Sequence, residues 1–478
     1  MKNKDLTQGP IFPHMLKMAL PMMIGMASHM LLNIVDGVYV SRLGMSESLA
    51  VLNYAFPFFY VIFAVFNGLT SGATSVLARY IGAKEKAKAE NALSQIVWVG
   101  LGLFLLFMLL YPLVLPLYLS LQKAPPASGE LTRQYLNTLF LGVPFTVLAL
   151  LWGSGLRAEG NTRTLMMGML VAVLANILIA PFLIFRGFRF AGVDWPGAGW
   201  GVSGAGLATT ASNALTALVV YLIFFRGKTL LRLRFWPEWS NRAGLRDAFA
   251  VGMPSILSQS LIGINLVILT RLAAPFGPAA VSAIGIGSRL ETLGVFPSLA
   301  IMVAVLSLVG QNFGAKRYDR VRQSVRIGLL TAFSSLTVVG LLVYAFRARL
   351  LGNFHPDPNT FSSAYHYLGI SSLGFGFVGM SIVSSGAFQG LGRGMPFLFL
   401  TTLRMVFIAA PMGFLLARTQ GEYGLHYAPI IASGCTAVLA SAWILGAVRR
   451  LKDETGPISD SPPVSGNSSV TASIPVPT

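Results

Sequence analysis

Residues 101–121 read LGLFLLFMLLYPLVLPLYLSL, a run without a single charged side chain. A second run of the same kind, IGLLTAFSSLTVVGLLVYAF, occupies residues 327–346. A helix needs about 20 predominantly apolar residues to cross the hydrocarbon core of a bilayer. Each run is therefore long enough for one transmembrane helix, and the fold depends on how many such runs the chain contains.

The composition of the whole chain is that of a membrane protein. Of its 478 residues, 54% are apolar and only 11% are charged, whereas ordinary soluble domains carry roughly 25% charged residues. The net charge of +18 does not indicate nucleic-acid binding, because the basic residues lie in short loops between apolar runs, where they orient a membrane protein. The single cysteine, Cys435, cannot form an internal disulfide or a zinc site.

Twelve apolar runs predict an all-α, multi-pass protein of the cell inner membrane. The expected spans are residues 15–40, 52–78, 92–118, 134–155, 164–186, 200–225, 248–272, 280–309, 324–347, 364–388, 396–417 and 425–448. With both termini in the cytoplasm, 24 Lys and Arg residues fall on the cytoplasmic side and 9 on the outer side, as the positive-inside rule requires. The first run lacks a signal-peptide cleavage site and is interpreted as a permanent helix.

The sequence repeats with an offset of 232 residues, which predicts two similar halves. At this offset three local patterns coincide: Gly82-Ala83-Lys84 with Gly314-Ala315-Lys316, Tyr135-Leu136 with Tyr367-Leu368, and Gly142 with Gly374. Six spans in each half give both repeats the same topology. We therefore expect two six-helix bundles related by a pseudo-two-fold axis along the membrane normal, with a site at or near their interface.

These halves define the expected domain organisation. The first bundle should occupy residues 1–225 and the second residues 248–450, with a cytoplasmic linker at 226–247 between them. The basic residues of the linker suit a position on anionic lipid of the inner leaflet. Residues 451–478 are rich in Ser, Pro, Thr and Val, which is typical of a disordered tail.

Five short motifs, in order along the chain, resemble those of the MATE (multidrug and toxic compound extrusion) family. They are Asn33-Ile-Val-Asp36-Gly with Arg42-Leu-Gly44, Arg79-Tyr-Ile-Gly82-Ala83-Lys84, Gly155-Leu-Arg157-Ala-Glu159-Gly160-Asn161-Thr162, Gly287-Ser-Arg289-Leu-Glu291 and Gly310-Gln311-Asn312-Phe-Gly314-Ala315-Lys316. The resemblance implies an antiporter, not an enzyme, that exports organic cations in exchange for protons or sodium ions by alternating access. We expect a monomer with no cofactor other than this coupling ion, and with membrane lipids but no nucleic acid as partners.

Asp36 is the only acidic residue inside an expected span of the first half. A carboxylate near the middle of a span costs roughly 2.5–3.5 kcal/mol, so it usually faces the interior of the bundle and has a function. A proton could neutralise Asp36, and a sodium ion or a cationic drug could compete for the same oxygens. Asn33 lies one turn earlier on the same helix face and could orient it. The alternative is a structural carboxylate held by neighbouring polar groups.

The resemblance implies three further residues in the cavity of the first half. Asn176 would join Asp36 in cation coupling, and Tyr135 and Thr209 would line the substrate cavity. Members of the family often carry an aspartate four residues after this asparagine, where the chain has Ala180. A site with two carboxylates is therefore not expected here, and an asparagine that only packs helices together is the alternative for Asn176.

Two charged residues stand in the eighth span, where the first half has Pro57 and Phe59 at the repeat offset. Glu291 is a second candidate for cation coupling, and Arg289 is a candidate for the substrate cavity. The alternative is that polar partners inside the second bundle balance each charge. Arg404 lies roughly 12 Å into the eleventh span, and its long side chain is expected to reach the cytoplasmic surface.

Other functions compete with multidrug antiport. A lipid-linked oligosaccharide flippase of the wider superfamily would be expected to line its cavity with basic residues, whereas the first span carries Asp36. Export of other small metabolites also stays open. A membrane enzyme would be expected to gather His, Asp or Glu at one interface, but the five histidines are scattered along the chain.

Overall fold

The part of the first half that the structure describes folds into seven helices and a short β-hairpin. A computed structural model describes residues 5–43, 46–122, 125–190, 192–227, 229–354 and 356–451. The elements of the first half are α1 (Ile11–Ser41), α2 (Ser46–Gly82), α3 (Lys86–Leu121), α4 (Pro126–Phe140), α5 (Val143–Ala158), α6 (Thr162–Ile184), β1 (Gly187–Phe190), β2 (Val193–Pro196) and α7 (Gly201–Phe225). We call α1 to α7 the N-lobe.

The second half, the C-lobe, repeats this order without a hairpin in its described part. Its elements are α8 (Ala243–Ala273), the 3₁₀ turn η1 (Ala274–Phe276), α9 (Pro278–Gly314), α10 (Tyr318–Gly352), α11 (Pro358–Ser371), the 3₁₀ turn η2 (Ser372–Gly374), α12 (Phe375–Gly390), α13 (Met395–Thr402), the π-helix η3 (Leu403–Ala409), α14 (Ala410–Gln420) and α15 (Glu422–Arg449). Within the described residues, 11 segments are long and apolar enough to cross a membrane, and the bent pair α4 and α5 makes 12. The predicted architecture of twelve membrane helices in two halves is confirmed.

The fourth and tenth spans are interrupted at the same place in the repeat. Hydropathy predicts a continuous span at 134–155, but α4 and α5 meet there at an angle of 46°. The break lies at Gly142 because Pro144, at the start of α5, has no N–H to continue the ladder of α4. In the C-lobe the 3₁₀ turn η2 interrupts the α-helix and ends at the matching residue, Gly374, but α11 and α12 continue as one span.

The repeat also fixes the turns that follow α2 and α9. Lys84 and Lys316, the lysines of the two Gly-Ala-Lys motifs, have φ angles of 61° and 57°. A left-handed backbone conformation is uncommon for residues other than glycine. Its presence at two positions separated by the repeat offset shows that the halves share detailed backbone geometry.

The helices differ in how much of their surface faces other helices. α2 and α9 are central, with 72% and 61% of their most apolar window buried, whereas only 17% of the α3 window is buried. The outer surface of α3 exposes Leu109, Leu113 and Leu121, each about three-quarters accessible. A soluble protein would not present such a surface, so these leucines form the lipid-facing side of the bundle.

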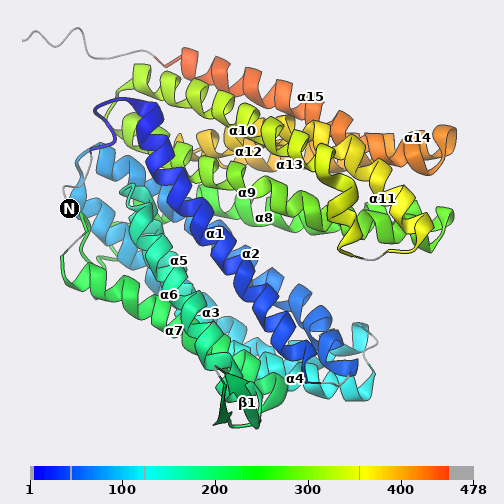
Figure 1. The fold of residues 1–478 in the computed structure, drawn as a ribbon. Helices are drawn as coiled ribbons and strands as arrows, with labels where there is room; N and C mark the ends of the chain where they lie inside the picture. The colour runs from blue at the N-terminus through cyan, green and yellow to red at the C-terminus, as the bar shows by residue number, and fades with distance from the viewer. Residues whose placement is uncertain are drawn as a thin grey trace, which may run out of the picture.

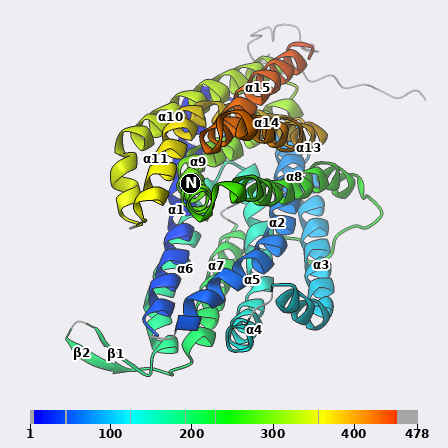
Figure 2. The same cartoon turned by 90° about the vertical axis from the view of Figure 1, so that its right-hand side faces the viewer.

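The lobes meet at one end, which we call the basic end. It carries the turns 83–85, 159–161, 315–317 and 391–394 and the linker residues 226–227 and 229–242. The opposite end is called the distal end. In Figure 1 the helices of both lobes lie together on the left and diverge towards the right, where α4 and α14 are far apart. Figure 2 looks towards the diverging ends, with the C-lobe above, the N-lobe below, and β1 and β2 projecting to one side.

Backbone contact between α2 and α9 closes the basic end. A Cβ on Gly82 would lie 1.9 Å from the carbonyl oxygen of Gln311, and a Cβ on Gly314 would lie 1.9 Å from that of Arg79. Only glycine permits an approach this close. Because the two glycines are related by the repeat, the crossing of α2 and α9 is itself pseudo-symmetric.

Polar contacts reinforce the crossing between the lobes. They are the hydrogen bonds from Ser75 to the carbonyl of Gln389, from Ser307 to that of Arg157 (2.8 Å) and from Gln311 to that of Ala158 (2.6 Å), and the ion pair between Arg79 and Asp247 (3.2 Å). All of them lie towards the basic end. The structure is therefore closed at the basic end and spread apart at the distal end.

Candidate functional site

The membrane interior of the N-lobe holds a cluster of polar side chains around Asp36. The Thr209 hydroxyl of α7 donates a hydrogen bond to Asp36 Oδ2 of α1 (2.9 Å). The Asn176 amide of α6 donates to the Thr209 oxygen (3.4 Å) and lies beside the Asp36 carboxyl. Asp36 and Asn176 are 4% and 0% exposed. Three helices thus bring together Asp36, Asn176 and Thr209, as the resemblance implies.

Two oxygens of this cluster remain without a hydrogen-bond donor in the described structure. They are Asp36 Oδ1 and Asn176 Oδ1, and both are buried. A buried acceptor without a partner is costly, and a carboxylate oxygen in this position can accept a proton. Carboxylate, amide and hydroxyl oxygens are also ligands that hard cations prefer. The residues present therefore fit either a proton or a sodium ion.

Apolar and aromatic residues enclose the cluster. Tyr135 of α4 is 7% exposed and lies near Asp36. Tyr39, one turn after Asp36, donates a hydrogen bond from its hydroxyl to the carbonyl of Ile177 (3.2 Å), which fixes α1 against α6. Ala180 is fully buried in the same apolar surroundings.

Two further positions singled out in the sequence, Ala180 and Asn33, concern this cluster. Ala180 contributes no second carboxylate, so Asp36 is the acidic group among the described side chains of the cluster. The backbone of Asn33 belongs to α1, but its side chain lies outside the part of the chain that the structure describes. Its orienting role stays a prediction.

A second polar cluster lies in the C-lobe and contains Glu291 of α9. The half-buried Glu291 carboxyl faces the side chains of Tyr367 and Ser371 of α11 and the guanidinium of Arg404. The Tyr367 ring lies where Gly287 has no side chain, since a Cβ there would be 2.2 Å from the ring. This explains the need for glycine four residues before Glu291.

Arg404 does not reach the cytoplasmic surface, contrary to the expectation from the sequence, but lies near Glu291. It belongs to the π-helix η3, and its charge interacts with Glu291 in the lobe interior. π-Helical turns are rare and are frequent at functional sites. Arg289, the candidate for the substrate cavity, is exposed on α9. The basic neighbour of Glu291 therefore comes from a distant span and not from the same helix.

Sequence reasoning missed Tyr367 and His426 as members of the C-lobe cluster. Their rings meet edge to face with centroids 5.3 Å apart, and both ring nitrogens of the buried His426 have no hydrogen-bond partner among the described residues. A signal for Tyr367 was present, because it matches Tyr135 at the repeat offset. Each lobe thus places a repeat-related tyrosine beside a carboxylate.

A family model described as MatE matches residues 21–182 and 254–415, more than half of the chain. The chain belongs to the MatE family of transporters. The matched segments start 233 residues apart, within one residue of the offset seen in the sequence. Each lobe of this MatE transporter is therefore one copy of the family's unit, and the resemblance stated from the motifs is confirmed.

Relatives and solved structures agree with this assignment. The multidrug export protein MepA of Staphylococcus aureus (strain bovine RF122 / ET3-1) is 26% identical over 449 residues, which cover 92% of this chain and 95% of MepA. The FAD transporter of Shewanella oneidensis is 27% identical over 436 residues, covering 89% and 92%. A structure described as the outward-facing conformation of a multidrug resistance MATE family transporter is 26% identical, with a TM-score of 0.86 over 95% of this chain and 99% of that one.

Proposed function

We propose that this MatE transporter is a secondary antiporter of the inner membrane that exports organic cations in exchange for protons or sodium ions. The observation that carries the proposal is the buried N-lobe cluster, in which one oxygen of Asp36 is bound by Thr209 and the other has no donor among the side chains that the structure describes. Such a carboxyl is suited to bind an ion or a proton on one side of the membrane and release it on the other. Its relative MepA, a multidrug export protein, supports this choice of substrates.

Export would proceed by alternating access between the two lobes. The present arrangement, closed at the basic end and spread at the distal end, suits the outward-open state if the basic end is cytoplasmic. The excess of Lys and Arg at that end supports this orientation, with both termini inside. The similarity to an outward-facing transporter is consistent with it.

Glu291 would contribute a second group to coupling in the C-lobe. It is an acidic side chain within a span, and it faces Tyr367 and Arg404. The nearby arginine lowers the attraction of this cluster for a metal cation. We therefore assign proton uptake, and not sodium binding, to Glu291.

Export of an anionic metabolite is a second candidate function. The Shewanella relative is a FAD transporter, and this chain places Arg404 inside the C-lobe and Arg289 on the exposed face of α9. Positive side chains of this kind can attract phosphate-bearing substrates. This candidate shares the fold and the alternation of the lobes with the first one but reverses the charge of the substrate.

Transport in sealed proteoliposomes tests both candidates. Vesicles would be preloaded with ethidium, an organic cation, or with FAD, and a pH gradient and a sodium gradient would be imposed separately. We expect gradient-driven movement of ethidium and none of FAD. Movement of FAD alone would establish the second candidate, and movement of neither substrate under either gradient would contradict both.

A further inference from the structure

Two segments of turns and irregular structure lie at the basic end, and each precedes the first helix of one half. Residues 5–9, which we call strap 1, lead into α1. Residues 229–241, which we call strap 2, lead into α8. At the repeat offset, strap 1 corresponds to residues 237–241, the last part of strap 2. The two segments therefore occupy matching positions in the two halves.

Strap 1 is held by side chains of the C-lobe. Asn312, near the end of α9, donates a hydrogen bond to the carbonyl of Leu6 (3.3 Å). Arg317 donates to the carbonyl of Thr7 (2.7 Å). Arg320, in the first turn of α10, donates to the carbonyls of Leu6 (3.2 Å) and Gln8 (3.3 Å). Hydrogen bonds from charged donors are stronger than those between neutral groups.

The side chain of Leu6 contacts the other lobe. It is 2% exposed and belongs to the main apolar core. A Cβ on Gly160, which follows α5 in the N-lobe, would lie 3.0 Å from its methyl group. The backbone of one residue is therefore fixed to the C-lobe while its side chain is seated in the N-lobe. Both attachments can exist together only while the lobes are closed at the basic end.

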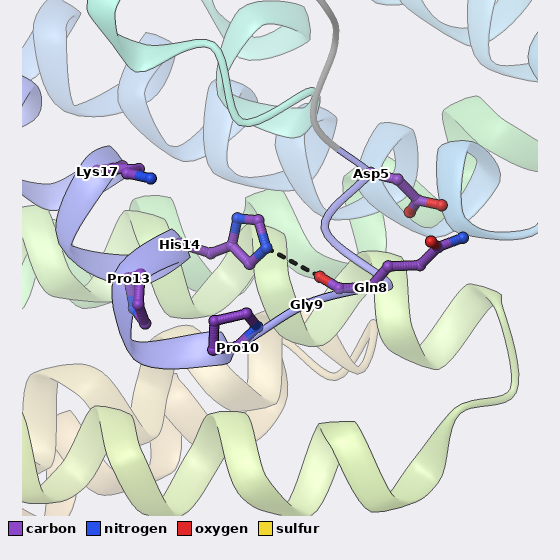
Figure 3. A pocket seen from close by; sticks show the side chains of 7 residues that line it. All are labelled: Asp5, Gln8, Gly9, Pro10, Pro13, His14 and Lys17. Atoms are coloured by element: carbon purple, nitrogen blue, oxygen red, sulfur yellow. Dashed lines mark hydrogen bonds between the residues drawn. The ribbon is translucent and has the colours of Figure 1, made fainter.

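Local contacts keep strap 1 in this shape. His14 of α1 donates from Nε2 to the carbonyl of Gln8 (2.9 Å), as Figure 3 shows for the hollow between the strap and the start of α1. The pKa of Asp5 is lowered: burial alone would raise it, but hydrogen bonds from Thr7 and the charges of Arg317 and Lys84 outweigh burial. Asp5 is therefore ionised and adds an attraction to the C-lobe.

Strap 2 is held in the same manner by the N-lobe. Its partners lie on the first turns of α3, the helix that corresponds to α10. The Glu90 carboxylate accepts hydrogen bonds from the amide of Arg232 (3.1 Å) and from the Arg234 guanidinium (3.1 Å). Asn91 accepts one from the amide of Glu238 (2.7 Å), and Gln95 donates to the carbonyls of Glu238 (2.6 Å) and Asn241 (2.9 Å). Strap 2 then continues into α8 of the C-lobe. Each strap thus joins the first helix of one half to the third helix of the other.

We propose that these crossed straps form a latch that holds the transporter closed at the basic end. Separation of the lobes there must remove Leu6 either from Arg320 and Asn312 or from its seat beside Gly160. The latch therefore stabilises the present state relative to one open at the basic end. The inference rests on the proposed alternation of the lobes, but on neither the coupling ion nor the substrate.

Distance measurements between spin labels test the latch in the full-length protein. In a Cys435→Ser background, labels at Lys88 and Gln323 report on the basic end, and labels at Leu121 and Arg349 report on the distal end; all four positions are exposed. The double variant Arg317→Gln, Arg320→Gln removes the charged donors to strap 1. We expect the population with a lengthened basic-end distance and a shortened distal distance to rise at least about tenfold, because the variant removes three hydrogen bonds from charged donors to strap 1.

Two further variants distinguish an opening of the lobes from a loss of structure in strap 1 alone. Leu6→Ala keeps the backbone hydrogen bonds but weakens the seat in the N-lobe, and it should shift both distances in the same direction. Arg326→Gln makes the same chemical change as the double variant at an exposed position of α10 and should leave both distances unchanged. Loss of strap structure alone would not move the distal pair. If the distal distances in the double variant and in Leu6→Ala match those of the parent, the latch is overturned. The change of both distances in the parent protein when substrate is added tests the alternation of the lobes separately.

Discussion

At the scale of single residues, the buried polar cluster of the N-lobe has one carboxyl group among its described side chains. Asp36 receives one hydrogen bond from Thr209 and is surrounded by Asn176 and Tyr135. With alanine at 180, the described part of this cluster has no second carboxylate to share a bound ion. Loss of the Asp36 charge should therefore not be compensated locally.

We expect Asp36→Asn to reduce gradient-driven export by at least about tenfold without loss of expression. Asparagine is nearly isosteric and can still accept the hydrogen bond from Thr209, but it cannot exchange a proton and offers a cation no negative charge. Ethidium flux would be measured in vesicles under a pH gradient and then under a sodium gradient. Asp194→Asn, the same change at a side chain that is 86% exposed in the hairpin, should transport as the parent does. Unchanged flux in Asp36→Asn would move the coupling role to Glu291.

The stability of the basic end should depend on pH because of the buried carboxyl group of Glu159. It is 8% exposed and accepts a hydrogen bond from the amide of Leu231 in strap 2 (2.8 Å). Burial raises its pKa to about 7, partly opposed by the amides of Leu231 and Leu230 and by Lys86. Because the folded-state pKa is above the unfolded one, its stabilising contribution is full below about pH 4.5 and is lost as the pH rises through 7.

Thermal unfolding between pH 5 and pH 8 measures this contribution. Glu159→Gln keeps an acceptor for Leu231 but cannot ionise, so its Tm should fall less than that of the parent as the pH rises. Glu130→Gln, at an exposed position of α4, serves as the control and should retain the parental slope. Equal slopes in all three proteins would show that Glu159 does not titrate in this range.

At the scale of elements, close helix crossings set the conformation. α2 and α9 approach so closely that Gly82 and Gly314 each touch a carbonyl oxygen of the other helix. A methyl group at either position must push the helices apart at the basic end. The two glycines occupy equivalent positions in this single crossing because the halves are repeats, so each glycine provides an independent check on the other.

Gly82→Ala and Gly314→Ala should each lower the stability of the closed basic end by roughly 1–3 kcal/mol, as overpacking does in tightly packed cores. A lower Tm would report this opening, together with greater labelling of a cysteine placed at the buried Ser307 in the Cys435→Ser background. Gly102→Ala in α3 is the matched control, because nothing lies within 4 Å of its Cβ position. If the three variants unfold at the same temperature, the glycines are not required for closure.

At the scale of the whole molecule, orientation follows from the charge distribution. The basic end carries most of the Lys and Arg residues, and the β-hairpin with Asp194 lies at the distal end. A cysteine at Asp194 in a Cys435→Ser background should react with a membrane-impermeant reagent added outside the cell, whereas one at Lys86 should react only after the membrane is opened. Reaction at Lys86 from outside would reverse the proposed topology. The background change is needed because Cys435 is exposed.

The order of residues along the chain was sufficient to predict the number of spans, the two halves and a carboxylate, Asp36, within the first span. Hydropathy, charge asymmetry and repetition are properties of the linear sequence, and a carboxylate inside an apolar run is conspicuous without a structure. The resemblance added Tyr135, Asn176 and Thr209, and the structure places all three beside Asp36.

Only the tertiary structure decided which distant side chains meet. It placed Arg404 rather than Arg289 near Glu291, added Tyr367 and His426 to the C-lobe cluster, and tied Leu6 to Arg320 across more than 300 residues of sequence. Such contacts depend on how each helix is rotated and where helices cross, and these are set by packing across the whole fold. Hydropathy reports that a helix crosses the membrane, but it does not report which of its faces meets which neighbour.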